Sequence, residues 1–537
     1  MAYEEASSLS VPNVLRDRLI TIEPGGIDRP ISLVELLARL LAGENDVLSF
    51  PRLAPVQRSY WYRFIVRCAA KALHSLGLGT REAGELEVND LAARIERSLA
   101  EAAGGEEAWL LYQSDPTRPA FLQPPTPDGA APDDTYTRNS MSILSSAIGS
   151  KNHERKYDVD RELDPELAIY ALIEYQTGVI FGGRGNYGSQ LMGSAAGAGS
   201  GTPFMGVRIG SGYRDTFRHD VSVFLSRWGE IRSHLRIEGN IWALWTVPWD
   251  GKSQLPASHL DPAFIPFARL VRLGEPMPDG RFDTVWFRAS DCARVADHSD
   301  GGLFGDIFTP LVPHPKHPGG RKVRGTLRNG YNYEEVVRLL FGFDAMPSAS
   351  VLALSDPRYP IPSRVRVVFE GTAFEQGKTC GFFYREVLFP SQNAIAFLAN
   401  PEPVAAVHKV MLRMAKEAKS AIRGATRILL AGSPKPRDGD GNKVEKPAQQ
   451  LEHAIDQVYI PTLLKAAEQY AKGDMKYVED WGRTLTEITR STFRDIMRGI
   501  PTSGARRYER EIYATTWLDF RLRVMRGEER TNEVGVA

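Results

Sequence analysis

Residues Pro403–Leu430 read PVAAVHKVMLRMAKEAKSAIRGATRILL, and their pattern determines the architecture expected of the whole chain. The apolar residues recur close to the 3.6-residue period of an α-helix, at Val407, Met411, Met414, Ala418, Ala421 and Ala425. Three further helical patterns follow, at Lys446–Lys472, Met475–Arg498 and Ala505–Arg526. Because mostly short linkers join these four segments, we predict an up-and-down four-helix bundle over residues 400–537.

Residues 1–399, which precede the bundle, mix helical and strand signals. Helices are predicted at 32–41, Val56–Leu78 and Asn89–Ala103, followed by a proline-rich loop at 114–134. Mixed short strands and loops are expected from there to about residue 400. The fold class predicted is therefore α+β: a large, mixed N-terminal α/β-containing domain, followed by the C-terminal four-helix bundle.

Strands are expected at three places in this large domain. The apolar runs Ile169–Phe181 and Phe204–Ile209 are strand-like and flank a glycine-rich stretch. Ile361–Phe389 has the pattern of a β-hairpin, with one strand at 364–369 and the other at 380–389.

Bulk composition limits the possible functions. The formal net charge is +0, which argues against a purely electrostatic nucleic-acid coat but leaves room for local basic patches. The three cysteines, Cys68, Cys292 and Cys380, are far apart and build neither a disulfide framework nor a CxxC-type zinc site. With no signal-peptide pattern and no apolar run of about 18 residues, a cytoplasmic protein without a membrane span is expected.

The glycine-rich stretch Thr177–Gly212 contains GxGxxG at Gly183–Gly188. A dinucleotide site needs a helix that opens on the third glycine and an acidic residue about twenty positions later. Here SQLMGSAAGAGSG follows, and no Asp or Glu occurs before Asp215. The pattern therefore favours either a flexible surface loop or a loop whose bare backbone approaches a groove or a phosphate.

The hairpin tip, Gly371–Thr379, resembles a phosphate-binding loop only superficially. Five residues separate its glycines where that motif has four, and a strand pattern follows where a helix is required. The tip is therefore either an exposed turn or a polar point that enters a partner molecule.

No catalytic constellation is visible in the sequence. His314 and His317 stand among prolines that favour an extended chain, so their imidazoles need not converge, and no third zinc ligand is near. Cys292 and His298 are equally isolated. We therefore expect no catalytic residue, no metal and no cofactor.

Five cations fall on one face of the helix at 403–430, at spacings of 4, 3, 7 and 4: Lys409, Arg413, Lys416, Arg423 and Arg427. A solvated helix face is the ordinary explanation of such a stripe. It is also the pattern of a surface that contacts a nucleic-acid backbone.

Taken in order, these landmarks resemble the CasA family, the large subunit of the type I-E CRISPR surveillance complex Cascade. The resemblance rests on the following segments: Pro119–Gln123, Phe181–Gly185 with Gly201–Pro203, Leu311–Pro315, the hairpin Glu370–Gly377 and the closing bundle. No single motif is specific to the family. The order and spacing of the motifs together are specific.

The resemblance implies particular DNA-reading residues. Gly182, Gly183 and Gly185 match a glycine loop that reads the protospacer-adjacent motif (PAM) from the minor groove. Gln376 matches a glutamine wedge, with Glu375, Gly377 and Lys378 beside it. Glu375 stands where the family usually has an amide, and a carboxylate near DNA phosphates is costly.

Two further parts of the family pattern are less well matched. The region of its lysine finger, Asp300–Phe308, holds no lysine here, so Arg288 and Arg294 are the substitutes considered. A loop that meets the complex near the guide RNA falls at 145–156 and includes Lys151, Asn152 and His153.

The implied function is that of a non-catalytic subunit that recognises the PAM in double-stranded target DNA, opens the duplex and helps recruit a helicase–nuclease. The implied partners are CRISPR RNA, target DNA, the other Cascade subunits and that helicase–nuclease. Two alternatives stay open: a nucleotide-binding enzyme that uses a glycine-rich loop, and a structural scaffold without DNA contact.

Overall fold

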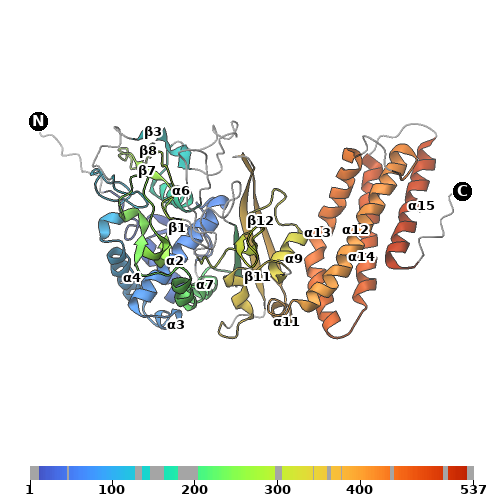
Figure 1. The fold of residues 1–537 in the computed structure, drawn as a ribbon, viewed down its shortest axis with the longest axis horizontal. Coiled ribbons are helices and arrows are strands. Elements are labelled where there is room, and N and C mark those ends of the chain that lie inside the picture. Colours follow the sequence, from blue (N-terminus) through green and yellow to red (C-terminus); the bar gives the residue numbers. More distant parts are fainter. Residues whose placement is uncertain are drawn as a thin grey trace, which may run out of the picture. The chain divides into compact units, whose positions relative to one another are not determined.

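The computed structural model describes residues 11–44, 47–126, 136–144, 162–178, 203–296, 305–342, 344–359, 364–375, 378–435, 441–499 and 506–528 of the 537-residue chain. The chain divides into two compact units (Figure 1). Unit 1 comprises Met1–Tyr331 and Asp344–Val387, and unit 2 comprises Asn332–Phe343 and Leu388–Ala537. The predicted domain boundary at 399/400 stays a prediction.

Unit 1 combines helices with several small sheets. Its helices are α1 Leu33–Ala42, α2 Arg58–Leu76, α3 Thr80–Ala83, α4 Val88–Ala102, α6 Pro165–Gly178, α7 Arg214–Ser226, α8 Trp228–His234 and α10 Ala349–Leu352. Short 3-10 turns lie at Pro55–Gln57, Glu106–Trp109, Met141–Leu144, Leu244–Thr246, Ala257–His259 and Ala353–Ser355.

The described strands form sheets of two or three members. They are β1 Ile20–Ile22, β2 Arg29–Ile31, β3 Thr137–Ser140, β4 Phe204–Ile209, β5 Ile241–Ala243, β6 Leu260–Ile265, β7 Leu270–Leu273, β8 Thr284–Arg288, β9 Leu311–Pro313, β10 Arg321–Val323, β11 Val365–Glu375 and β12 Lys378–Phe389. The orders are β1-β2, β10-β9, β12-β11-β4, β3-β8-β7 and β5-β6.

Helix α2 runs through the core of unit 1. Its apolar residues are buried, with Trp61 and Cys68 at 1% and 0% exposure. The helix ends at Gly77, whose φ of +66° is a left-handed conformation that suits glycine. Phe64 stacks on Trp61, and Tyr170 of α6 meets the Trp61 ring edge-on at 5.1 Å between centroids. This central position lets α2 hold segments from many parts of the chain.

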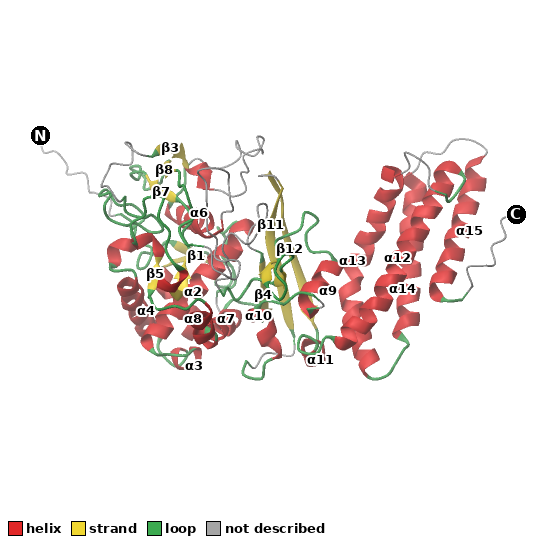
Figure 2. Ribbon diagram, in the orientation of Figure 1, coloured by secondary structure: helices red, strands yellow, loops and turns green. Residues whose placement is uncertain are grey.

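Unit 2 contains the predicted bundle. Its helices are α9 Tyr333–Phe341, α11 Gln392–Ala396, α12 Glu402–Ala431, α13 Gly441–Ala471, α14 Tyr477–Gly499 and α15 Arg506–Arg526 (Figure 2). All six predicted stripe residues of α12, from Val407 to Ala425, are buried. The indole Nε1–H of Trp481 on α14 donates to the Met411 carbonyl at 3.2 Å and ties α12 to α14. The predicted α+β class with a C-terminal helical bundle is therefore confirmed.

The structure corrects several predictions between residues 134 and 400. The described part of the run predicted as a strand at 169–181 is helical, because 169–178 belong to α6. Eleven consecutive residues of this helix, from Ala168 to Gly178, are buried, so it lacks the one-sided apolar stripe that marks a surface helix. Helices α7, α8 and α9 also lie in a region where short strands and loops were expected to dominate.

Candidate nucleic-acid interface

At one end of the three-stranded sheet β12-β11-β4, strand β4 begins and strand β11 runs on toward the hairpin tip. Strands β11 and β4 pair antiparallel, from Val365 opposite Ile209 to Glu370 opposite Phe204. The glycine-rich stretch leads into Phe204, and β11 continues past Glu370 to the hairpin tip. In an antiparallel pair the start of one strand lies beside the end of the other. The chain that enters β4 at Pro203 and the chain that leaves β11 at Glu375 are therefore at the same end of the sheet.

The predicted hairpin is confirmed, and its strands are longer than expected. Two residues separate β11 from β12, and a connection this short joins antiparallel neighbours. Gly371 lies within β11, where an added Cβ would stand 2.0 Å from Thr326 Oγ1 and 2.7 Å from the Tyr331 hydroxyl. This glycine thus permits close strand packing and is not part of a phosphate-binding loop.

Helix α2 contacts both described ends of the glycine-rich stretch. Arg63 donates from Nη2 to the Pro203 carbonyl oxygen at 2.6 Å. At the other end, a Cβ added to Gly178 would stand 2.4 Å from the Tyr60 ring. The two ends of residues 179–202 are therefore fixed on one helix, by side chains that lie within one turn of each other.

The described end of the expected lysine-finger region, residues 305–308, meets the same place. Arg63 Nε donates to Asp306 Oδ2 at 3.1 Å, and both side chains are buried. The Phe308 ring stacks on Phe204 with 4.9 Å between centroids, and the Met205 amide donates to the Phe308 carbonyl at 2.8 Å. Residues near 203, 306 and 371 belong to three segments that are far apart in the sequence. They thus lie close together beside α2.

Sequence reasoning missed Arg63 and its neighbour Arg67. They stand four positions apart on α2, among its apolar core residues, and both are buried. Cations at core positions of an apolar helix are the signal that points to buried ion pairs. Burial lowers the pKa of Arg67 to about 10, with the Asp306 carboxylate opposing that shift.

Most of the predicted recognition residues lie outside the described residues. This holds for Gly182, Gly183, Gly185, Gln376, Gly377, Lys151, Asn152 and His153. Glu375 is the last residue of β11, and Lys378 is the first of β12. Their assignments as DNA or complex contacts stay predictions.

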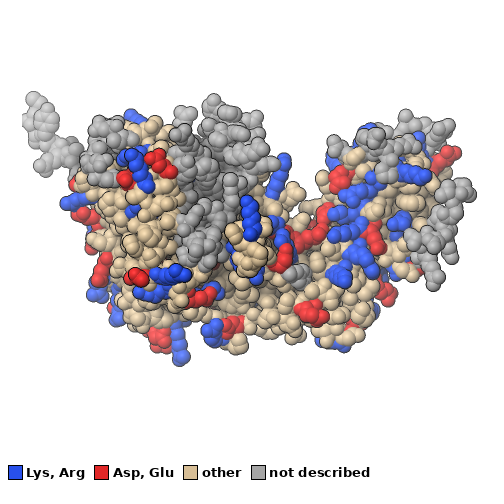
Figure 3. Space-filling view, viewed as in Figure 1, with Lys and Arg blue, Asp and Glu red and all other residues tan. Residues whose placement is uncertain are grey.

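Three of the five cations predicted on the bundle border an open groove. Lys409, Arg413 and Lys416 are exposed on α12, and none forms an ion pair or hydrogen bond within the described residues. The groove has a volume of about 440 Å³ and is lined by Lys409, Leu412, Arg413, Lys416, Glu417, Ser420 and Arg521. Arg521 comes from α15, so a second helix adds a fourth cation. Figure 3 shows Lys and Arg side chains gathered on one face of the bundle.

The other two cations of the stripe have different surroundings. Arg423 is half-buried and binds Glu445 of α13, with Nη2 at 3.0 Å from both carboxylate oxygens. Arg427 is half-buried as well, and its Nε has no hydrogen-bond partner within the described chain. The stripe therefore contains three exposed cations that form no ion pair within the described residues and two that pack within the bundle.

The substitutes considered for the lysine finger are also placed. Arg294 is only 2% exposed, and it donates from Nη2 to the Pro248 carbonyl at 3.2 Å beneath the Trp249 ring. A buried guanidinium of this kind cannot reach a duplex without unfolding its surroundings. Arg288 is the last residue of β8 and is half-buried.

The histidine pair differs from its expected geometry. The segment turns back between β9 and β10, with the His314 amide donating to the Gly320 carbonyl at 2.9 Å. The rings of His314 and His317 therefore meet, 4.4 Å apart between centroids, although the prolines favour an extended chain. Across the described ranges, no group of three or more His, Cys, Asp or Glu side chains is placed to hold a metal ion.

No described helix is both long and apolar enough to cross a membrane.

No protein-family model and no curated protein sequence matches the chain. Solved structures do match its fold. CRISPR-associated protein Cse1 from Acidimicrobium ferrooxidans superposes with a TM-score of 0.69 at 13% identity, over 97% of this chain and 99% of that one. CasA of Thermus thermophilus gives a TM-score of 0.65 at 14% identity, over 97% and 100%. Cse1 of Thermobifida fusca gives 0.64 at 12%, over 96% and 98%.

The resemblance drawn from the order of sequence landmarks is thus confirmed at the level of architecture. Along nearly its whole length, the chain has the fold of the CasA (Cse1) proteins.

Proposed function

We propose that this chain is the large subunit of a type I-E CRISPR RNA-guided surveillance complex, in which it recognises the PAM of double-stranded target DNA and starts strand separation. The observation that carries the proposal is the convergence of three segments beside α2, in a chain with the CasA fold. Several short segments can act together on one stretch of duplex when a rigid element holds them in fixed positions.

The chemistry of the glycine loop suits the minor groove. This groove offers few distinguishing hydrogen-bonding groups, so recognition there depends on shape and backbone approach. Gly182, Gly183 and Gly185 have no side chain to keep the backbone from the groove. The described residues on either side of their segment, Gly178 and Pro203, both lie against α2.

Gln376 is proposed as the wedge, flanked by Glu375, Gly377 and Lys378. A polar planar side chain at the end of a stiff two-stranded hairpin can replace stacking at the first base pair and hold it open. Further sequence is then read by pairing with CRISPR RNA, as in other RNA-guided effectors.

The basic groove of the bundle is proposed to hold the DNA backbone. Lys409, Arg413 and Lys416 form no ion pair within the described residues, and their positive charge suits phosphates of displaced or flanking DNA. Arg423 and Arg427, the two half-buried cations of the stripe, are proposed to assist this contact with the DNA backbone.

The subunit is proposed to be non-catalytic, without metal or cofactor, and to work in the cytoplasm. Cutting is left to a helicase–nuclease that the complex recruits. Lys151, Asn152 and His153 are proposed to meet the guide RNA or neighbouring subunits.

Reconstitution tests the proposal. Binding of a PAM-bearing duplex is compared for the complex with this chain, without it, and with Gly183→Asp. We expect loss of target binding in the last two cases, since an acidic side chain would repel the groove. Gly229→Asp is the matched control, because Gly229 is exposed and a Cβ there meets nothing within 4 Å. Equal binding with and without the chain would instead make it a scaffold without DNA contact.

A further inference from the structure

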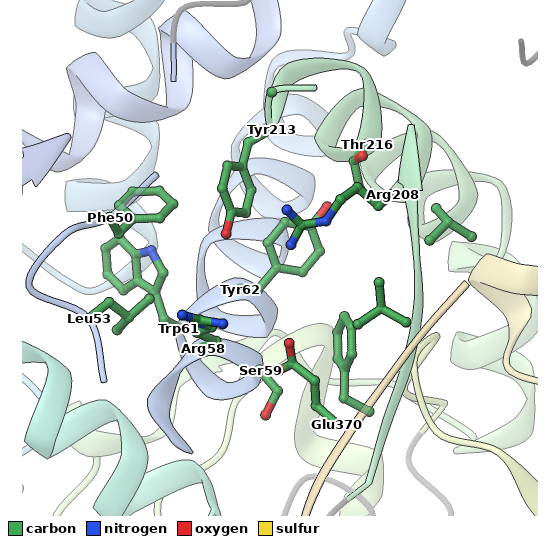
Figure 4. A pocket seen from close by; sticks show the side chains of 14 residues that line it. Phe50, Leu53, Arg58, Ser59, Trp61, Tyr62, Arg208, Tyr213, Thr216 and Glu370 are labelled. Carbon is green, nitrogen blue, oxygen red and sulfur yellow. The ribbon is translucent and has the colours of Figure 1, made fainter. Parts of the chain in front are cut away.

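A cavity in unit 1 lies against the sheet that carries the hairpin. Its volume is about 40 Å³, and α2, β4 and β11 all contribute to its lining (Figure 4). A space of this size holds on the order of three water molecules. It therefore has room for a small polar group rather than for a whole nucleotide.

Positive charge surrounds this cavity. Arg58 is exposed at its edge and forms no ion pair or hydrogen bond within the described residues. Arg208 of β4 lies over the Tyr213 ring at 5.6 Å, and its nearest carboxylate oxygen, on Glu386, is 3.8 Å away. The first turn of α2 also lines the cavity, and the N-terminal end of a helix favours an anion.

Glu370 supplies the second, independent sign of a ligand. Its side chain lines the cavity, the residue is only 4% exposed, and Oε2 has no hydrogen-bond partner among the described residues. A buried polar atom without a partner is destabilising, so a group that bonds to it is expected. The cavity thus combines two guanidinium groups with a carboxyl group that nothing in the described chain satisfies.

We propose that this cavity is a binding site for a single phosphate group, held by the guanidinium groups of Arg58 and Arg208 and by the protonated carboxyl of Glu370. The two arginines donate to the phosphate oxygens, and the O–H of Glu370 donates to a third. Tyr62 and Tyr213 form an aromatic wall of the cavity beside Arg208 (Figure 4).

The protonation of Glu370 fits this role. Burial raises its pKa to about 7, against the opposing effect of the nearby arginines. The charged and titratable groups around it are Arg58, Tyr60 and Arg63 of α2, Arg208 of β4, and Tyr384 and Glu386 of β12. Near neutral pH the carboxyl is therefore readily protonated, and a bound anion favours that form further.

Anion binding is consequently linked to proton uptake. Where only the protonated form of Glu370 binds, a pKa near 7 makes the affinity about tenfold weaker at pH 8 than at pH 6. A ligand that donated hydrogen bonds to an ionised Glu370 would show the opposite dependence.

Calorimetric titration of the full chain with dimethyl phosphate tests the proposal, because this diester keeps one charge between pH 6 and pH 8. We expect saturable binding that weakens about tenfold over this range. Glu370→Gln should bind at pH 8 about as tightly as the wild type binds at pH 6, because its amide donates at any pH. Arg208→Gln and the exposed variant Arg58→Gln should each lose at least about tenfold, whereas Arg232→Gln, an exposed position on α8, should change nothing.

Absence of saturable binding, stronger binding at pH 8, or full affinity in both Arg58→Gln and Arg208→Gln would overturn the proposal.

A competition arm identifies the source of the phosphate. Displacement of dimethyl phosphate by a short DNA duplex supports a nucleic-acid phosphate, and displacement by inorganic phosphate alone supports a free one. Neither result depends on PAM recognition, so the cavity and the proposed function can fail separately.

Discussion

Arg63 and Pro203 are joined by a 2.6 Å hydrogen bond from the guanidinium Nη2 to the carbonyl oxygen. This bond links the second turn of a core helix to the residue at which the described chain resumes after residues 179–202. The same guanidinium binds Asp306, so one side chain holds two segments that lie 103 positions apart in the sequence.

Replacing Arg63 by Ala is therefore expected to lower both stability and DNA binding. It leaves the Asp306 carboxylate buried at 1% exposure without its closest cation. Removing one partner of a buried pair costs about 3–5 kcal/mol. Scanning calorimetry of the full chain measures the reduction in stability. Arg81→Ala serves as a control, since the side chain of Arg81 is 88% exposed, and a change as large as that of Arg63→Ala would contradict the account.

Gly371→Ala is expected to destabilise unit 1 by about 1–3 kcal/mol, because its methyl group overlaps Thr326 Oγ1. Adding Thr326→Ala removes that oxygen, so the double variant should regain part of this stability. Urea unfolding followed by tryptophan fluorescence checks both. Gly229→Ala, where a Cβ meets nothing within 4 Å, should stay close to the wild type. A double variant less stable than Gly371→Ala alone would refute the steric explanation.

Asp220 should make stability depend on pH. Its carboxylate accepts from the Tyr62 hydroxyl at 2.7 Å and from Ser350 Oγ at 2.5 Å, and burial raises its pKa to about 6. The unfolded value is about 3.9. A raised folded pKa gives stability that is fully present below about pH 4 and is lost as the pH rises through 6, here about 3 kcal/mol.

Asp220→Asn lacks that titration. Its free energy of unfolding, measured in urea from pH 4 to pH 7, should therefore gain about 3 kcal/mol relative to the wild type across the range. A difference between the two proteins that stays constant with pH would show that Asp220 does not titrate in this window.

The basic groove predicts a salt effect. Replacing Lys409, Arg413 and Lys416 together by Ala should reduce the slope of log K against log[salt] for DNA binding by up to about 3, near 1 for each phosphate that is no longer neutralised. The matched control replaces three exposed lysines elsewhere in unit 2, Lys465, Lys472 and Lys476. An equal slope for both triple variants would mean that the α12 cations form an ordinary solvated face.

The bundle and the hairpin were predictable because each has one buried and one exposed face. The stripe from Val407 to Ala425 repeats with the helical period, and β12 alternates, so local spacing reveals both. Helix α6 gives no such signal, since its second half is buried on every side and an apolar run of that length also suits a strand.

The candidate site was less predictable than the fold. Glycine spacing and a polar tip indicated which segments to propose for recognition, but the closeness of the residues that flank them depends on Arg63 and on the pairing of β4 with β11. The phosphate cavity joins Arg58, Arg208 and Glu370, which are more than 100 positions apart. Only the tertiary fold brings residues this far apart together, so no local sequence pattern predicts the cavity.

The most direct test of the proposed function measures opening of the first base pair next to the PAM. A target duplex carries 2-aminopurine at that position, and its fluorescence is followed on addition of the reconstituted complex. With the wild-type chain, and with the exposed control Gln449→Ala, fluorescence should rise for PAM-bearing duplex only. With Gln376→Ala the rise should be lost. An undiminished rise in Gln376→Ala, or an equal rise without a PAM, would contradict the claim that this chain reads the PAM and opens the duplex.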